Sequence, residues 1–497
     1  MLKILNKIRL RSVKLDNQVD RGQIFCFDFI LGFSMLSIML SILSLLGVYK
    51  PFFISGFILP IHLVLFPWIL FLGLTVFICY DDCICRNMNV SMVTLLVMFG
   101  VLAKLIANLP SPQYYDKSMM FKYIFKDSVI NSIIISAALF FSQSLLNTLY
   151  LFIQKNMVDK LHFLKCFSFV ISSSISLIIL QAALAYLSPV FSLNITECTL
   201  IYITNGVFSV VLYYFSIPFS RWIFKNEKIK PYDTRFEEYR YGWLRFNVRK
   251  KNYIRLVVGG ENFNPIYKCN YLCALAMIYM LFMILSGMTV YKILDLWGVT
   301  IPVAVLSVPF IYGSSNVITE VYGFPVARNM IWWYVVTSFI FTSLSLVLSY
   351  MPGNLPTIGI ESYHLVLGSM PIIFIAGTIG TFIAMNINNQ VVSKLKRRLD
   401  GYHYWFRSLV STAGGELVYN AIAYPIMFFG TMSLYNFIGI VVNVSMFKLL
   451  MTAVICPLEC FFVVLLKKAE RINVFDFDVN YSVFRTSIRK SYLKNSQ

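Results

Sequence analysis

Charged side chains stand inside long apolar stretches in the second half of the chain. Glu416 lies about eleven residues into the stretch at 405–431, and Lys448 lies near the middle of the stretch at 438–466. A charge near the middle of a bilayer costs at least about 2.5 to 3.5 kcal/mol, so such a residue is a functional candidate by default. Glu416 and Lys448 are therefore candidates for substrate binding or energy coupling. The alternative is an ion pair that only holds two helices together.

Asn316 and Glu320 form a second candidate group. They are four residues apart, so their side chains share one face of a helix. Because Glu320 lies close to the end of an apolar stretch, its carboxylate could alternatively reach the lipid headgroups. Asn420 adds an amide one helical turn after Glu416. Carboxylates and amides that gather in this way favour a site for a polar ligand.

The elements that carry these residues are predicted to be membrane-spanning helices. The chain has 497 residues, 58% of them hydrophobic and 13% charged, and its mean hydropathy is +0.72. An apolar run of about twenty residues can cross the hydrocarbon core as a helix. We predict an all-α polytopic membrane protein with about twelve transmembrane helices. The predicted spans are 24–48, 55–79, 88–109, 128–153, 165–188, 196–223, 270–290, 297–318, 330–350, 365–388, 405–431 and 438–466.

The net charge of +19 is explained by topology. Alternate connections and both tails carry 35 of the Lys and Arg residues, whereas the connections on the opposite side carry 5. This positive-inside bias predicts that both termini are cytoplasmic and that the protein lies in the inner membrane. Since the positive charge is accounted for in this way, the partners are expected to be the lipid bilayer and a small molecule, and no nucleic acid.

The sequence contains an internal repeat. A shift of 242 residues places Val48-Tyr49-Lys50 on Val290-Tyr291-Lys292 and Arg86-Asn87-Met88 on Arg328-Asn329-Met330, and it aligns the six spans of each half. Two tripeptide matches at one offset indicate a duplication. Since six is an even number of spans, the repeats should be parallel, with an axis along the membrane normal.

The repeats have diverged unequally, and the polar residues stand in the second half. Opposite Glu320 and Glu416 the first half has Ile78 and Ser174. We therefore predict that the first repeat is a degenerate copy and that the second repeat carries the transport site. The protein is then a possible monomer, in which the first copy replaces a second subunit. The predicted segments are a basic cytoplasmic tail (1–23), the degenerate repeat (24–223), a basic cytoplasmic linker (224–268), the working repeat (269–466) and a second basic cytoplasmic tail (467–497).

Two motifs in the second half resemble a known family. Residues 314–328 read SSNVITEVYGFPVAR, and residues 404–412 read YWFRSLVST, followed by GEL at 415–417 and IAYPI at 422–426. They resemble the signatures of the queuosine precursor transporter family, also called the vitamin uptake transporter (VUT) family. The resemblance covers roughly residues 270–466. The chain departs from the family pattern in its extra first copy, at Glu416, where Gln is common, and at Tyr419, where an acidic residue is expected.

The resemblance implies transport of a 7-deazaguanine such as queuine, preQ0 or preQ1. Such a ring presents adjacent N1–H and NH2 donors, which a carboxylate accepts, and a flat face on which aromatic side chains stack. Arg328 and Arg407 are alternatively anchors on the basic side of the membrane. The expected substrate-binding residues are Asn316, Glu320, Tyr322, Trp332, Trp333, Arg407, Glu416 and Asn420, with Glu416 and Lys448 as candidates for coupling or helix pairing.

Other functions remain open alternatives. The cargo could be another vitamin, a nucleobase or a nucleotide-like metabolite, and the chain could be a non-catalytic assembly subunit. An enzyme is not expected, because no cluster of His, Asp or Cys suited to acid–base chemistry stands out. The ten cysteines and four histidines are scattered, and no phosphate-binding GxxxxGK[ST] motif occurs. We therefore expect neither a metal site nor a cofactor.

Overall fold

The computed structural model describes most of the chain. The described residues are 28–48, 50, 52–54, 57–59, 61–80, 82–112, 117–156, 162–187, 195–227, 271–296, 299–351, 356–428, 434–470, 473–476 and 479–484. The predicted tail at 1–23 and the greater part of the predicted linker at 224–268 lie outside these residues, as does the predicted C-terminal tail from 485 onward.

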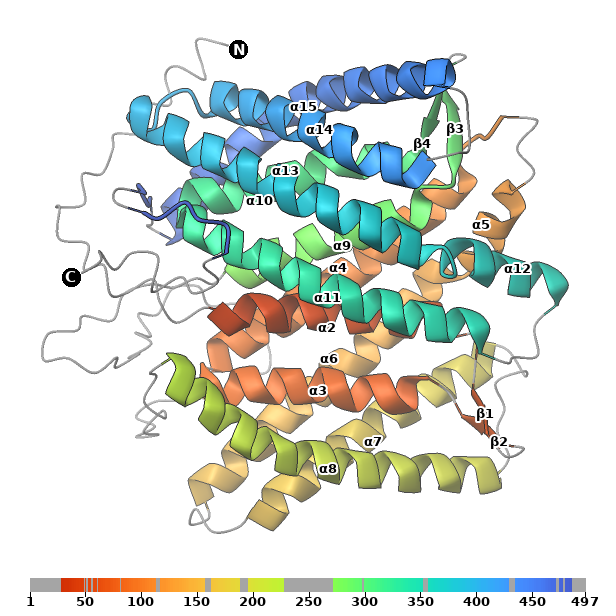
Figure 1. The fold of residues 1–497 in the computed structure, drawn as a ribbon. Coiled ribbons are helices and arrows are strands. Elements are labelled where there is room, and N and C mark those ends of the chain that lie inside the picture. Colours follow the sequence, from red (N-terminus) through yellow and green to blue (C-terminus); the bar gives the residue numbers. More distant parts are fainter. Residues whose placement is uncertain are drawn as a thin grey trace, which may run out of the picture.

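The described chain is a bundle of long α-helices that lie side by side (Figure 1). The first half contains α2 (Asp28–Leu46), β1 (Phe52–Ile54), β2 (Phe57–Leu59), α3 (His62–Cys79), α4 (Asp82–Asn108), α5 (Ser118–Ile124), α6 (Ser128–Asn156), α7 (His162–Leu187) and α8 (Ile195–Glu227). The second half contains α9 (Leu272–Thr289), β3 (Ile293–Leu296), β4 (Val299–Pro302), the 3-10 helix η2 (Val303–Ser307), α10 (Val308–Tyr322), α11 (Phe324–Tyr350), α12 (Thr357–Val366), α13 (Met370–Arg398), α14 (Tyr404–Phe428) and α15 (Leu434–Glu470).

The apolar helices confirm a polytopic all-α membrane protein. Within the described residues, ten helical spans are long and apolar enough to cross a membrane. They include α2, α3, α4, α7, α8, α9, α11 and α15, together with α5–α6 and α12–α13. Two further helices of the second half, α10 and α14, fall outside this set. The count of twelve spans stays a prediction.

Two of the predicted spans begin too early. The predictions at 55–79 and 297–318 placed helix where the chain forms antiparallel hairpins, β1 with β2 and β3 with β4. In the second half the helical conformation begins only after Pro302, the last residue of β4. A proline lacks the N–H that a helix interior needs and disfavours helical backbone at the residue before it. Apolar content alone, on which the prediction rested, does not distinguish a short apolar hairpin from a helix.

The two halves repeat the same elements at one spacing. Adding 242 to the bounds of α4 gives those of α11, and adding 242 to the bounds of α6 gives those of α13. Each half also has a hairpin after its first long helix and a short helix, α5 or α12, before its fourth. Both hairpins and both short helices lie at one end of the bundle (Figure 1), which is the arrangement expected of parallel repeats.

Reciprocal lysine contacts join the two halves. Lys50 donates from Nζ to the carbonyl oxygen of Ser349, and its ammonium lies 5.0 Å from the ring centroid of Tyr363. Lys292 donates to the carbonyl oxygen of Ala107 at 3.1 Å and lies 5.7 Å from the ring centroid of Phe121. Each partner in one set is 242 residues from its counterpart in the other. Such mutual contacts are the mark of a two-fold interface.

Small residues let α13 and α14 pack closely. A Cβ atom added at Gly380 of α13 would lie 3.0 Å from the Cβ of Ala423, and one at Gly415 of α14 would lie 3.2 Å from the Cβ of Asn388. In a bilayer, packing of this kind takes over from the hydrophobic effect as a force between helices. Large apolar side chains of α15, such as Val454 and Phe461, stay exposed on the outside of the bundle, as on a lipid-facing surface.

Candidate functional site

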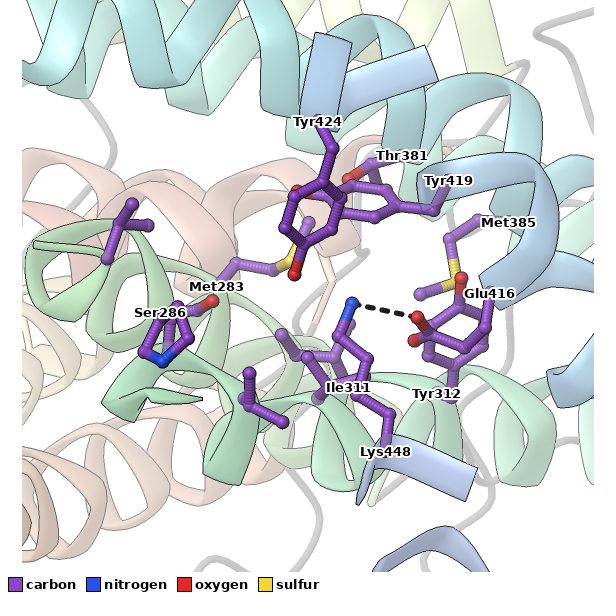
Figure 2. A pocket seen from close by; sticks show the side chains of 15 residues that line it. Met283, Ser286, Ile311, Tyr312, Thr381, Met385, Glu416, Tyr419, Tyr424 and Lys448 are labelled. Atoms are coloured by element: carbon purple, nitrogen blue, oxygen red, sulfur yellow. Dashed lines mark hydrogen bonds and ion pairs between the residues drawn. The ribbon is translucent and has the colours of Figure 1, made fainter. Parts of the chain in front are cut away.

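A pocket lies inside the second half, between α9, α10, α13, α14 and α15. Its volume is about 70 Å³, enough for a few water molecules. Its wall is mostly apolar, with one acidic and one basic side chain and three tyrosines (Figure 2). The polar and aromatic lining residues are Ser286, Tyr312, Thr381, Glu416, Tyr419, Tyr424 and Lys448.

An ion pair between Glu416 and Lys448 forms the polar wall of this pocket. Lys448 Nζ lies 2.8 Å from Glu416 Oε2, and both side chains are 2% exposed. The same Nζ donates to Asn420 Oδ1 at 3.1 Å, and Asn420 donates to Ser445. The ammonium also lies 4.9 Å from the ring centroid of Tyr419. Glu416 Oε1 has no hydrogen-bond partner, so half of the carboxylate remains available to a ligand.

A layer of uncharged polar side chains follows the pocket along α14. Ser408, Thr412, Glu416 and Asn420 are spaced four residues apart and therefore lie on one face of this helix. Asn316 of α10 donates to Ser408 at 3.0 Å and to Thr412 at 3.1 Å. All of these side chains are buried. The layer extends from the pocket toward one end of the bundle, the end that lies opposite the two hairpins.

Glu320 lies at that opposite end, at the centre of what we call the Glu320 cluster: Glu320, Lys396, Arg407 and Lys467. Arg407 binds both carboxylate oxygens, at 2.6 and 3.2 Å. Lys467 Nζ lies 2.5 Å from Oε1 and Lys396 Nζ lies 3.6 Å from it. The four side chains are 9% exposed or less. Three cations thus bind one carboxylate, and the ion pairs join α10 to α13, α14 and α15.

Backbone carbonyls disperse the surplus positive charge of the Glu320 cluster. Lys396 donates to Val474 O at 2.6 Å and to Glu320 O at 2.5 Å. Arg407 donates to Tyr402 O and Gly401 O in the turn between α13 and α14. Buried charges need such partners to offset the loss of hydration. Neither Glu320 nor Arg407 extends to the surface, so the alternatives of headgroup contact and surface anchoring do not describe them.

The chain after α15 folds back over this end of the bundle; we call residues 473–476 and 479–484 the C-terminal strap. Asp476 accepts hydrogen bonds from the N–H of Phe324 at 3.0 Å and from Ser393 at 2.5 Å. It thereby caps the start of α11, directly after Gly323, whose φ of 94° suits glycine. Arg328 donates to Asn480 O and Ser482 O at 3.1 and 2.6 Å.

Tyr481 fixes the strap to α13. Lys394 and Arg397 lie 5.1 and 5.9 Å from the centroid of its ring, and burial raises the pKa of its hydroxyl. The hydroxyl also lies 2.9 Å from Ser393 Oγ. The part of the predicted cytoplasmic tail that the structure describes is therefore a packed element.

The sequence-predicted residues separate into two groups. Glu416 and Lys448 line the pocket, Asn420 binds Lys448, and Asn316 lies in the layer between the pocket and the cluster. The other predicted binding residues lie away from the pocket; they are Glu320, Tyr322, Trp332, Trp333 and Arg407.

The predicted aromatic residues have other partners. Tyr322 donates to Glu470 Oε1 at 3.1 Å, and Trp332 donates to Val483 O in the strap at 2.9 Å. Trp333 packs against Phe29 of α2, in the other half of the chain. The rings at the pocket belong instead to Tyr312, Tyr419 and Tyr424.

The sequence prediction also omitted a buried carboxylate, Glu459 of α15. It is 4% exposed and accepts a hydrogen bond from Ser408 at 2.7 Å. The signal was present, because Glu459 interrupts the same apolar stretch as Lys448. For the tyrosines no comparable signal existed, since aromatic residues are common throughout the spans.

Apolar helices that bury ion pairs and amides make this chain a multi-pass membrane protein with a polar interior. Residues 302–462 match the model of the family described as "Putative vitamin uptake transporter". This confirms the family resemblance that the two motifs predicted, and it supports membrane transport as the role of the second half. The polar layer, most of the pocket lining and most of the Glu320 cluster lie inside the matched segment, whereas Met283, Ser286 and Val290 of the pocket precede it. No curated protein and no solved structure matches the chain.

Proposed function

We propose that this transporter imports a queuosine precursor, a 7-deazaguanine, through the pocket of its second half. The observation that carries the proposal is the carboxylate of Glu416, which lies among three tyrosines and has a hydrogen-bond partner on only one of its two oxygens. Oε2 is held by Lys448 while Oε1 has no partner, and the hydroxyl of Tyr312 at the same pocket also has none. Buried polar atoms without partners are costly, so a ligand that binds them gains affinity.

The chemistry of the pocket suits a guanine-like ring. Its adjacent N1–H and NH2 groups are donors, and Glu416 is an acceptor that is fixed in place by Lys448. Lys448 can donate to the ring carbonyl oxygen, which lies beside N1–H. The faces of Tyr419 and Tyr424 supply stacking surfaces. In this proposal Glu320 and Arg407 do not contact the cargo.

The position of the pocket gives a direction of entry. Its lining includes Val290, Pro302 and Ala304, which adjoin the hairpin of the second half. The Glu320 cluster and the C-terminal strap close the opposite end. In the proposed topology the hairpins face outward, and the precursor would enter the pocket from their side.

Complementation tests the cargo. In a strain that can neither make nor import deazaguanines, expression of this chain should restore queuosine in tRNA when queuine, preQ0 or preQ1 is supplied. The readout is queuosine in digested tRNA, and an immunoblot of the membrane fraction establishes that the protein is inserted. Inserted protein that restores no queuosine with any of the three precursors contradicts the proposed cargo, and uptake of another nucleobase or vitamin would then replace it.

We also infer that the first half replaces a second subunit, so that one chain is the active unit. The reciprocal contacts of Lys50 and Lys292 support this, because through them the two halves of one chain bind each other as two subunits of a dimer would. The expected result is a monomeric mass for transport-active protein in detergent, measured by light scattering with the detergent contribution subtracted. Activity confined to a dimeric fraction would contradict it.

A further inference from the structure

Glu459 lies between the pocket and the Glu320 cluster. It stands eleven residues after Lys448 on α15, which corresponds to about 16 Å along a helix. Lys467 of the cluster follows eight residues later, about 12 Å further along the same helix. Glu459 is buried, with 4% of its surface exposed.

The carboxyl group of Glu459 contacts Ser408 of α14 and occupies a space beside Gly313 of α10. Ser408 donates to Oε2 at 2.7 Å, whereas Oε1 has no hydrogen-bond partner. Oε1 lies against α10 at Gly313, where an added Cβ would be 2.7 Å from it. The absence of a side chain at Gly313 therefore makes the room that this carboxyl group occupies.

Glu459 has no cationic partner among the residues that the structure describes. In the described part of the chain, no Lys, Arg or His nitrogen lies within 4.0 Å of its carboxylate, in contrast to Glu320 and Glu416. The titratable groups that face it are Tyr404 of α14 and the two cysteines of its own helix, Cys456 and Cys460.

The other charged groups nearby have partners of their own. Arg407 of α14 directs its guanidinium to Glu320, and α10 contributes Gly313 to the space around Glu459. An ionised carboxylate in such a place loses its hydration free energy without gaining a compensating charge. A protonated carboxyl group is neutral and loses far less. The site therefore favours a carboxyl group that carries its proton in this state.

Polar side chains lead from the pocket to this carboxyl group. Ser408, which donates to Glu459, accepts from Asn316, and Asn316 also donates to Thr412. One turn beyond Thr412 on the same face of α14 stands Glu416 in the pocket wall. Because the Asn316 amide donates to the hydroxyl oxygens of Ser408 and Thr412, the hydroxyl proton of Ser408 is left to point at Glu459.

We propose that Glu459 is a proton-binding site that couples transport to proton movement. The carboxylate accepts one proton from the pocket side, forming an O–H bond, and that bond breaks when the proton leaves toward the opposite side later in the cycle. The proposal rests on the transport function proposed above. The protonation site itself does not depend on the identity of the cargo.

Infrared spectroscopy tests the proton site without any cargo. Reconstituted protein at neutral pH should show the C=O stretching band of a protonated carboxylic acid, with the expected shift in D2O. The band should be lost in E459Q and kept in E361Q, a control that removes an exposed carboxylate of α12. Identical spectra for the wild-type protein and E459Q in this region would overturn the proposal.

Vesicle transport tests the coupling. With a precursor that supports complementation, an inward proton gradient should drive accumulation by the wild-type protein and by E361Q. E459Q should exchange labelled for unlabelled precursor but lose accumulation above the external concentration. Accumulation by E459Q at the wild-type level, or exchange by the wild-type protein with no response to the gradient, overturns the coupling and leaves the transporter assignment intact. If no precursor is exchanged at all, the cargo proposal fails and the infrared result alone decides the proton site.

Discussion

Replacing Glu416 by Gln is expected to abolish precursor uptake and to lower the free energy of unfolding by about 3 to 5 kcal/mol. The substitution leaves Lys448 buried and charged, with Asn420 as its remaining neutral partner. Uptake is measured with labelled precursor, and stability is measured by thermal unfolding of the detergent-solubilised protein. The loss of uptake follows because an amide cannot accept two donors side by side as a carboxylate does.

A double substitution separates binding from helix pairing. Removing both charges of a buried pair is often neutral for stability, so E416Q combined with K448M should recover most of the unfolding temperature. Uptake should stay absent, because the pocket then has neither the carboxylate nor the ammonium. Recovery of uptake in the double variant would show that the ion pair only joins α14 and α15, the alternative that the sequence left open.

The sequence predicted the helices better than it predicted the site. Apolar runs and the repeat at 242 residues located the long helices, because lipid contact requires apolar residues wherever a helix crosses the bilayer. The same signal did not identify the hairpins, since β3 (ILDL) and β4 (VTIP) are short segments made largely of apolar residues. In the second half, the signal that distinguishes the hairpin from the following helix is Pro302, a residue that is unfavourable inside a helix.

Charge partners could not be assigned from the sequence. Glu320 was identified correctly as an unusual buried carboxylate, but its partners stand 76, 87 and 147 residues away in the chain. Only the packing of four helices brings them together. The helical spacing of Glu320 and Asn316 suggested one site, whereas the structure joins Asn316 to the polar layer and Glu320 to a separate ionic cluster.

The C-terminal strap is a second feature beyond sequence reasoning. The basic residues that predicted a cytoplasmic tail flank the strap, which itself contains no Lys or Arg. Its contacts are made mainly by backbone carbonyls and Asp476. Backbone acceptors are present in every segment, so no residue pattern marks the ones that a buried Arg328 will use. Arg328 of the family motif was interpreted from the sequence as an anchor on the basic side of the membrane, and in the structure it binds the carbonyl oxygens of the strap.

Replacing Glu320 by Gln is expected to prevent accumulation of folded protein in the membrane. The variant leaves Arg407, Lys396 and Lys467 buried together with no anion among them, and removing one partner of a buried ion pair alone costs about 3 to 5 kcal/mol. The measurement is the amount of protein that stays monodisperse after extraction in mild detergent. Ile78 occupies the corresponding position of the first half, so I78A is the matched control and should extract normally.

Neutralising a cation should partly rescue this variant. Lys467 is the most exposed member of the Glu320 cluster at 9%, so the added substitution K467Q removes one uncompensated charge at the smallest cost in packing. Extraction of E320Q with K467Q should exceed that of E320Q alone, because the remaining repulsion falls with each charge removed. If E320Q instead extracts like the wild-type protein and loses only uptake, Glu320 acts on the cargo or its coupling ion. The proposal that the pocket binds the cargo while the Glu320 cluster only stabilises the fold would then be wrong.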